Sequence, residues 1–260
     1  MTHEATSAHT TPVPVALQLY SLREALTQDL RGTIERVARL GYQGVEPFGL
    51  TRQSAPVQKA LFDEYGLQVP SVHAPLHLPD KADEALAVAE LLGCQRIASG
   101  YGPEAYVDLN AIDRATDGFN HAQRLAATHG LRYAIHNHWW EFEPVAGTRP
   151  YRRMLEALDP HVCFQVDVYW VQAAGLDPLT VLEELGSRAE TLHLKDGSTV
   201  KEDPMTALGS GNVDIRAIAA ATIRTAAWWI VELDRCATDM FVAVDESLRY
   251  LRRLRSPSPR

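Results

Sequence analysis

Eight short runs rich in β-branched and other apolar residues recur along the chain at nearly even spacing. The mean interval between the starts of successive runs is about 30 residues, the length that a strand, a crossover helix and two loops occupy. The sequence therefore indicates a βα unit repeated eight times. The runs begin at Val15, Tyr42, Gln68, Gln95, Leu131, Cys163, Glu190 and Trp228.

The segments between these runs have the pattern of amphipathic helices. Residues 29–41, 84–93 and 112–130 space apolar side chains three and four apart and end in glycine. Eight alternating units predict a single (β/α)₈ TIM barrel, since the alternative, a doubly wound sheet, usually needs fewer strands. We expect the barrel to span residues 15–254, with a disordered leader at 1–14 and a flexible tail at 255–260.

Composition narrows the classes of partner. With 25 Lys and Arg against 33 Asp and Glu, the formal charge is −8, which disfavours nucleic acid. No stretch approaches the ~20 apolar residues needed to cross a bilayer, and the first residues lack the features of a signal peptide. Three scattered cysteines fit a reducing compartment. We expect a cytoplasmic protein that binds a small molecule and not a membrane. Such barrels often form homo-oligomers, but the sequence leaves the oligomeric state open.

Polar residues follow most of the predicted strands at their carboxyl ends, where a TIM barrel carries its active site. Placing so many ionisable groups inside one ring costs several kcal/mol unless they pair or share a cation. A bound metal ion would resolve this. The residues are Gln18, Glu46, His73, His136, His138, Asp167, His193, Lys195 and Glu232.

The last four units offer a metal-ligand set of Glu141, Asp167, His193 and Glu232. Three carboxylates and one imidazole suit Mn²⁺, Mg²⁺, Co²⁺ or Zn²⁺. The alternative is that these are ordinary polar residues at strand ends. His136 alternates with His138 on one face, so either could replace Glu141 as a ligand, bind the substrate, or be a core histidine.

Other polar and aromatic residues have two interpretations each. Lys195 could stabilise a developing enolate oxygen or form a structural ion pair. Glu46 and His73 are expected to contact substrate, unless they cap loops. Trp170 lies in an aromatic group that suits a sugar ring, although strand-end aromatics often only cap a barrel. The glycines of LGSGNVD lack the spacing of a nucleotide fingerprint, so this loop would at most touch a phosphate.

Several local motifs resemble those of a known family. LQLYSLR, GYQGVEPFG, VPSVHAPL, HNHWWEF, QVDVYWV, HLKD, GSGNVD and VELDR are similar to the xylose isomerase-like TIM barrels of the sugar phosphate isomerase/epimerase superfamily. That superfamily includes inosose dehydratases, tagatose/psicose epimerases and the endonuclease IV branch. The resemblance covers roughly residues 15–254.

The resemblance implies a divalent metal held by ligands on strands five to eight, at Glu141, Asp167, His193 and Glu232. The sequence departs from the family pattern in two places. Several branches have a glutamate ligand inside the fifth strand, where this chain has His136. Many relatives have an acidic residue between the glycines of the GSGNVD loop.

The expected activity is that of an isomerase or epimerase in carbohydrate metabolism. A proton α to a carbonyl is too weakly acidic for a carboxylate to remove unaided, so a chelated metal must stabilise the enediolate. Glu232 and Glu141 are the expected acid/base pair on a ketose, keto-inositol or related sugar, with Lys195 assisting.

Three other functions remain open at this point. The same metal-bound enediolate would serve a dehydratase or lyase, including glycoside elimination. An abasic-site endonuclease would want three metals and a basic rim, and a non-catalytic sugar-binding barrel could lose a ligand.

Overall fold

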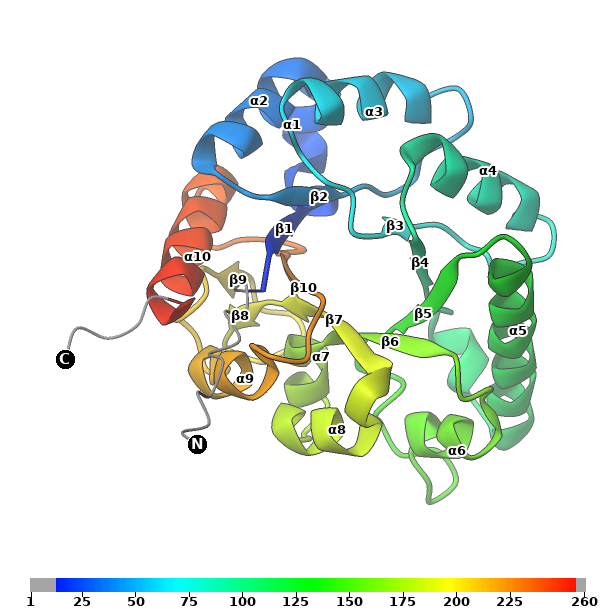
Figure 1. Ribbon diagram of the computed structural model, residues 1–260. Helices are drawn as coiled ribbons and strands as arrows, with labels where there is room; N and C mark the ends of the chain where they lie inside the picture. The colour runs from blue at the N-terminus through cyan, green and yellow to red at the C-terminus, as the bar shows by residue number, and fades with distance from the viewer. Residues whose placement is uncertain (1–12, 256–260) are drawn as a thin grey trace, which may run out of the picture.

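Eight parallel strands curl into a nearly closed barrel with helices around it (Figure 1). The computed structural model describes residues 13–255, and in this range the main sheet has the order β2-β1-β10-β7-β6-β5-β4-β3. Seven of the eight predicted runs contain a whole strand, and β7 begins one residue before the run at Glu190, so the predicted (β/α)₈ TIM barrel is confirmed. They are β1 (Val15–Gln18), β2 (Gly44–Glu46), β3 (Val72–His73), β4 (Arg96–Ser99), β5 (Arg132–His136), β6 (Cys163–Asp167), β7 (Ala189–Leu194) and β10 (Trp228–Val231).

The barrel closes between β2 and β3 through isolated contacts rather than a regular ladder. Single bridges join Gly44 to Gln68 and Phe48 to His73. The His73 N–H donates to the Pro47 carbonyl at 3.0 Å, and two further backbone bonds involve Gln68, one through its carbonyl and one through its N–H. We call this junction the β2–β3 seam.

Helices cover the outside of the strand ring. Three of them, α2, α4 and α5, match the predicted helical segments, and Gly41 ends α2 with φ of 93°, a conformation that glycine adopts without strain. The helices are α1 (Arg23–Gln28), α2 (Leu30–Leu40), α3 (Ala55–Glu64), α4 (Ala82–Leu92), α5 (Leu109–Thr128), α6 (Pro150–Ala157), α7 (Val168–Ala173), α8 (Pro178–Leu185), α9 (Ile215–Thr222) and α10 (Met240–Arg255), with short 3₁₀ turns η1 (Leu19–Leu22), η2 (Pro103–Tyr106) and η3 (Gly186–Arg188).

The apolar run that begins at Cys163 is not a strand along its whole length. The strand stops at Asp167, because this side chain caps a helix: its Oδ1 accepts from the backbone N–H groups of Tyr169 and Trp170, both at 3.1 Å. Tyr169 and Trp170 therefore lie in α7, and the sequence pattern alone did not separate strand from helix here.

Strand alternation decides which side chains face the barrel interior. Ala16, Trp228 and Ile230 form a small buried cluster of their own, while neighbouring Leu17 and Trp229 belong to the main core shared with the helices. Because side chains alternate with a period of two, residues two positions beyond the interior ones continue on the interior face. The polar strand ends reach the interior in this way.

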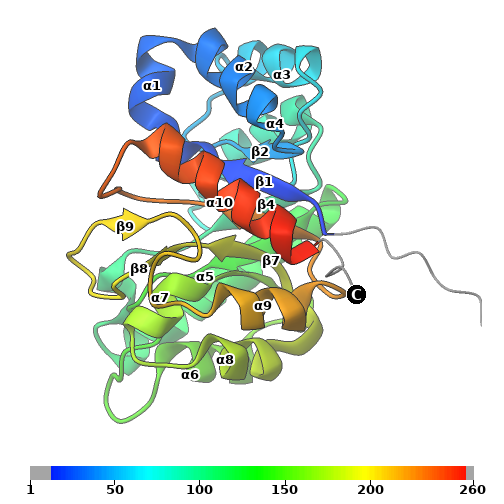
Figure 2. The same ribbon diagram turned by 90° about the vertical axis from the view of Figure 1, so that its left-hand side faces the viewer.

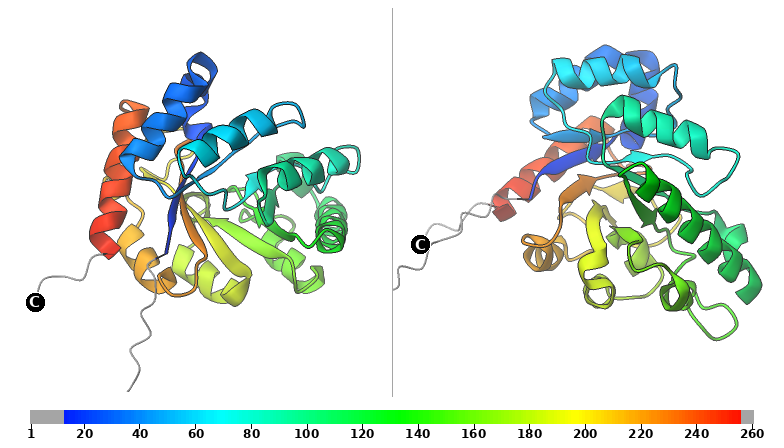
Figure 3. Two further views of the ribbon diagram at one scale, coloured as in Figure 1. Left: turned by 45° about the horizontal axis from the view of Figure 1, so that its top comes forward. Right: turned by 45° about the vertical axis from the view of Figure 1, so that its right-hand side comes forward.

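Additional structure follows β7 at the end of the barrel where α7 begins (Figure 2). Two short antiparallel strands, β8 (Asp196–Gly197) and β9 (Met205–Thr206), lie within the predicted long loop. In Figure 3 the red helix α10 lies beside the blue N-terminal segments, and the Tyr42 hydroxyl donates to the Val244 carbonyl at 2.7 Å. The first and last helical layers therefore meet.

The proposed leader and tail fall mostly outside the described residues. Of the predicted leader at 1–14, the structure describes Val13, which is buried, and Pro14; of the tail at 255–260 it describes Arg255, where α10 ends. Among residues 13–255, no helix is both long and apolar enough to cross a membrane.

Candidate metal and catalytic site

Four side chains from consecutive strands of the sheet converge at the carboxyl end of the barrel. His136 ends β5, Asp167 ends β6, His193 lies in β7 and Glu232 directly follows β10. One potential ligand atom of each lies within 4.8 Å of those of the others, and all four residues are buried. We call these four residues the metal group; three of them are predicted ligands, and His136 is one of the alternatives to Glu141.

Glu141 lies apart from the metal group. Glu141 is five residues beyond the end of β5. Its Oε2 accepts the backbone N–H of His138 at 2.9 Å, and its Oε1 has no hydrogen-bond partner among the described residues. Burial raises the pKa of the Glu141 carboxyl to about 8. Glu141 is therefore placed to hold the turn after β5, and it does not join the other predicted ligands.

The residues of the metal group fit a divalent cation. The Nδ1 atom of His136 is buried and has no hydrogen-bond partner within residues 13–255. Burial, followed by the nearby imidazoles, holds the pKa of His136 well below its usual value, so this ring is neutral and can offer a lone pair. Two imidazoles with two carboxylates form a donor set that suits Zn²⁺, Co²⁺ or Mn²⁺.

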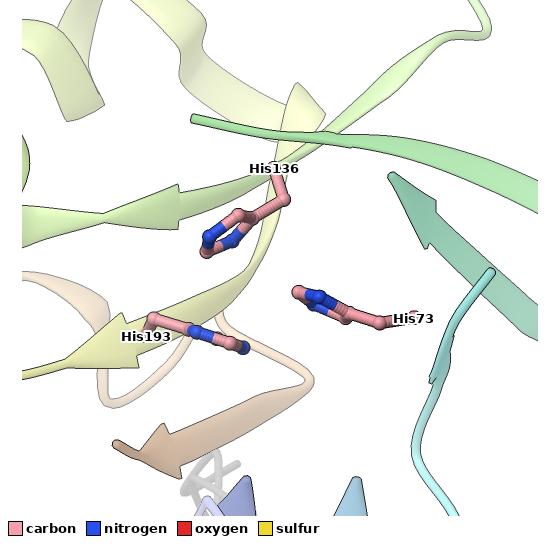
Figure 4. Close-up of side chains that lie close together, drawn as sticks. All are labelled: His73, His136 and His193. Atoms are coloured by element: carbon pink, nitrogen blue, oxygen red, sulfur yellow. The ribbon is translucent and has the colours of Figure 1, made fainter. Parts of the chain in front are cut away.

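A second group contains three imidazoles. The rings of His73, His136 and His193 gather toward one another from three different strands (Figure 4). The His73 ring stacks on His193 with centroids 5.3 Å apart, and the His136 centroid lies 4.6 Å from that of His193. His73 therefore borders the metal group.

Lys195 is a fully buried cation beside the metal group. Its Nζ lies 2.9 Å from Asp167 Oδ2, 2.8 Å from Glu232 Oε2 and 3.0 Å from Asp234 Oδ1. Although burial opposes the charge, these three carboxylates raise the pKa of Lys195 well above its usual value. Asp234 was not among the predicted residues; its alternation with Glu232 in VELDR is the signal that would have indicated it.

The acidic members of the metal group differ in protonation. Burial raises the pKa of Asp167 to about 6, against the attraction of Lys195 and His193. Burial acts in the same direction on Glu232, but Lys195 and His193 outweigh it and lower the Glu232 pKa well below its usual value. Glu232 is therefore ionised at neutral pH.

Glu46 lies beneath His193 and does not line the cavity described below. Its Oε2 is 2.6 Å from His193 Nε2 and 2.7 Å from the Gln18 amide nitrogen, and its Oε1 accepts from Ser71 and Gln165. Burial disfavours the charge, but His73, His193 and these hydrogen bonds lower the pKa of Glu46 to about 2.

Two members of this network, Ser71 and Gln165, were also absent from the prediction. Each lies two residues before a predicted one, His73 or Asp167, on the same strand face. Strand alternation would therefore have indicated both.

A cavity of about 760 Å³ opens over the metal group. This volume is within the range of small-molecule sites in proteins. Asp167, His193, Glu46 and Glu141 do not line it. The predicted site residues that do are Gln18, His73, His136, His138, Trp170, Lys195 and Glu232.

One wall of the cavity is aromatic. The His138 ring stacks on Trp140 with centroids 4.2 Å apart, and Trp139 lies 4.7 Å from Trp170. The Trp170 Nε1 is buried and lacks a hydrogen-bond partner among the described residues, as does His138 Nδ1. An apolar ring face with such polar atoms is typical of sites for sugars.

The GSGNVD loop is held by a carboxylate of the chain itself. Asp196 accepts the backbone N–H groups of Gly197 and Val213 with Oδ1 and those of Gly209 and Gly211 with Oδ2, at 2.8–3.0 Å. A Cβ on Gly211 would lie 2.3 Å from Asp196 Oδ1. These donors are therefore engaged by Asp196, which explains the glycines without a bound phosphate.

Comparisons with known proteins agree with the barrel. A family model described as xylose isomerase-like TIM barrel matches residues 34–254. No curated protein matches the chain significantly.

Among solved structures, the chain is similar to a sugar phosphate isomerase/epimerase from Parabacteroides distasonis, with 24% identity, a TM-score of 0.80 and 97% of each chain covered. It is also similar to a probable 3-DHS dehydratase from Bacillus anthracis, with 14% identity and a TM-score of 0.74 over 92% of this chain and 98% of that one. A D-allulose 3-epimerase from Methylomonas sp. has 16% identity and a TM-score of 0.69 over 94% and 99%. At these identities the likeness concerns the fold.

Proposed function

The chain belongs to the xylose isomerase-like TIM barrel family, and on this premise we propose that it is a divalent-metal-dependent isomerase or epimerase of a ketose, keto-inositol or related sugar. The observation that carries the proposal is the convergence of His136, Asp167, His193 and Glu232 under an aromatic-walled cavity. A divalent ion held there would polarise a substrate carbonyl and offset the negative charge that forms when the α-proton leaves.

Glu232 is the proposed proton acceptor. It lines the cavity, and Lys195 and His193 keep it ionised. The Lys195 ammonium also lines the cavity, where it can hydrogen-bond to a substrate oxygen that gains negative charge. Removal of the α-proton by one group and return by another on the opposite face would invert the stereocentre.

We assign the second proton-transfer role to His138 rather than to Glu141. His138 lines the cavity, whereas Glu141 does not. Burial lowers the pKa of His138 to about 3, so its ring is neutral, and its Nδ1 has no partner among the described residues. A neutral imidazole can relay a proton, since one nitrogen takes up a proton while the other gives its own to the substrate.

The second candidate is a dehydratase or lyase that uses the same residues. After Glu232 takes the α-proton, protonation of a β-hydroxyl or a glycosidic oxygen would release water or an alcohol instead of inverting a centre. The pairing of a buried ammonium at Lys195 with the imidazole of His138 in one cavity favours this candidate, because both can donate to a leaving oxygen. An abasic-site endonuclease is disfavoured by the net charge of −8.

The test is α-proton exchange. Protein loaded separately with Mn²⁺, Co²⁺, Zn²⁺ and Mg²⁺ is incubated in D₂O with a panel of ketoses and inososes, and ¹H NMR follows each α-proton. Exchange with recovery of an epimer supports the first candidate, and exchange with an unsaturated product supports the second. Exchange that persists in Glu232→Gln rules out Glu232 as the acceptor, and no exchange with any sugar contradicts proton abstraction.

A further inference from the structure

We propose that Glu46 is a positioning residue for two imidazoles, His193 and His73, which keeps a proton on Nε2 of each ring and directs Nδ1 at the site. For His193 this inference rests on the proposed metal centre. Sequence reasoning expected Glu46 to contact substrate, but Glu46 is fully buried and absent from the cavity lining.

The partners of Glu46 surround both of its oxygens. Oε2 contacts Gln18 Nε2 and His193 Nε2, and Oε1 contacts Ser71 Oγ and Gln165 Nε2. An ionised carboxylate accepts hydrogen bonds and cannot donate them. Each of these four atoms must therefore donate, and His193 must carry a proton on Nε2.

The other nitrogen of His193 is the one directed at the metal group. His193 Nδ1 lies 2.7 Å from Oε2 of Glu232, which is itself a member of that group. By the same rule Nδ1, which faces the ionised Glu232, carries a proton in the metal-free protein, and a cation would displace that proton. Because Glu46 retains the Nε2 proton, Nδ1 is the nitrogen that faces the cation. The structure thus specifies Nδ1 as the coordinating atom of His193.

Glu46 reaches His73 both directly, with Oε2 3.3 Å from His73 Nε2, and through Gln165. The Gln165 amide nitrogen donates to Glu46 Oε1 at 2.7 Å, so the amide oxygen is left to face His73 Nε2, 2.6 Å away. An amide oxygen accepts only, and His73 Nε2 must donate to it. His73 then has its lone pair on Nδ1, in a ring that lines the cavity.

A carboxylate in this position has a known kind of effect on a metal site. Partners that hold the second nitrogen of a ligating histidine fix its tautomer and orientation, and removing them typically weakens metal binding 10–100-fold. In Glu46→Gln, the amide must direct its N–H₂ at atoms that are themselves donors in the wild type. With the N–H₂ beside His193, that ring can accept only by moving its proton to Nδ1, toward the metal group. With the N–H₂ beside Ser71 and Gln165, a neutral amide oxygen faces the His193 Nε2–H and holds it less strongly than the carboxylate does.

The direct test uses the unaltered protein. In ¹⁵N-labelled protein loaded with Zn²⁺, long-range ¹H–¹⁵N correlation of the imidazole rings should show His193 with a proton on Nε2 and Zn²⁺ on Nδ1, and His73 protonated on Nε2. Zn²⁺ bound to His193 Nε2, or a proton on His193 Nδ1 in the loaded protein, would overturn the proposal. Gln165→Leu should alter the His73 ring signals and leave those of His193 in place.

The affinity test compares two buried carboxylates. Chelator competition should give a Zn²⁺ affinity 10–100-fold weaker in Glu46→Gln than in wild type. Glu190→Gln is the matched control: Glu190 is mostly buried near the start of β7, at the opposite end of the barrel, and pairs with Arg96 and Arg132. The Zn²⁺ affinity of Glu190→Gln should stay at the wild-type value. A wild-type Zn²⁺ affinity in Glu46→Gln would contradict the proposal.

Failure of the proposed function gives a different result. If wild-type protein binds no Zn²⁺, Mn²⁺ or Co²⁺, the metal-dependent function is wrong. The role of Glu46 is then decided in metal-free protein by the Nε2–H signals of His193 and His73. Their loss in Glu46→Gln supports the positioning role, and their persistence rules it out.

Discussion

Lys195 Nζ lies 2.9 Å from Asp167 Oδ2, the carboxylate oxygen that is not used to cap helix α7. Asp167 thus divides its two oxygens between a helix N-terminus and a buried cation. Lys195 also pairs with Glu232 and Asp234, so three carboxylates beside the metal group share this one buried ammonium. The stability of the metal-free protein should therefore depend on Lys195.

We expect Lys195→Met to destabilise the metal-free protein by about 3–5 kcal/mol at neutral pH, because it leaves buried carboxylates without a partner. The deficit should shrink at acidic pH, where those carboxylates take up protons. Urea unfolding in the presence of a chelator measures it. Lys59→Met, which removes only the exposed pair with Asp63, should cost less than about 1 kcal/mol. Equal losses in both variants would contradict the buried charge balance.

Asp167→Asn should abolish metal retention, because the amide keeps the helix cap but lacks the carboxylate charge. Elemental analysis after growth in Mn²⁺- or Zn²⁺-supplemented medium is the measurement. Asp177→Asn is the control, since Asp177 also caps a helix, α8, but is exposed and is not a member of the metal group. One ion per chain in the control and none in Asp167→Asn is the expected result, and equal occupancy would remove Asp167 from the ligand set.

Glu141→Gln should change how stability depends on pH. Burial raises the Glu141 pKa to about 8 from a usual 4.5, so the folded state holds its proton more tightly than the unfolded state does. The stability that Glu141 contributes is complete below pH 4.5 and is lost as pH rises through 8. As pH rises from 4.5 to 8, the free energy of unfolding of Glu141→Gln should increase relative to that of wild type by on the order of a few kcal/mol.

Denaturant titrations at pH 4.5, 6 and 8.5 measure this dependence. Glu143→Gln is the control, because Glu143 lies two residues further along and is half exposed. The pH dependence of its unfolding free energy should be parallel to that of wild type. Parallel behaviour of Glu141→Gln would show that the carboxyl is charged in the folded protein.

Asp196→Asn should release the GSGNVD loop. The amide can accept fewer hydrogen bonds than the carboxylate, and an amide N–H₂ would face backbone donors, at a cost of about 1–3 kcal/mol for each donor left without a partner. Hydrogen exchange at the amides of Gly209, Gly211 and Val213 should accelerate, while added inorganic phosphate should not slow it in the wild type. Slowing by phosphate would instead identify an anion site.

The eight strands were predictable because each is a short apolar run at a fixed interval from the next. The positions of Asp167, His193 and Glu232 were predictable for a related reason: in a parallel barrel, strand order and the end of each run place their side chains at one rim. The position of the Glu141 side chain was not predictable, because the sequence indicates where β5 ends but not the path of the turn beyond it.

The contact between Glu46 and His193 could not be predicted from strand order. Strands β1 and β10 separate β2 from β7 in the sheet, so these two side chains meet across the interior rather than along a ladder. Such contacts depend on the diameter of the ring and the length of each side chain. Neither is encoded in the spacing of apolar runs.

Glu46 also has a structural role at the β2–β3 seam. Where a ladder of backbone bonds would normally join two strands, the Ser71 hydroxyl donates to the Glu46 carboxylate across the gap. Glu46 thus both positions the His193 ring and helps to close the barrel. The same carboxylate therefore links the closure of the barrel to the position of His193, so a change at the β2–β3 seam would be felt in the metal group.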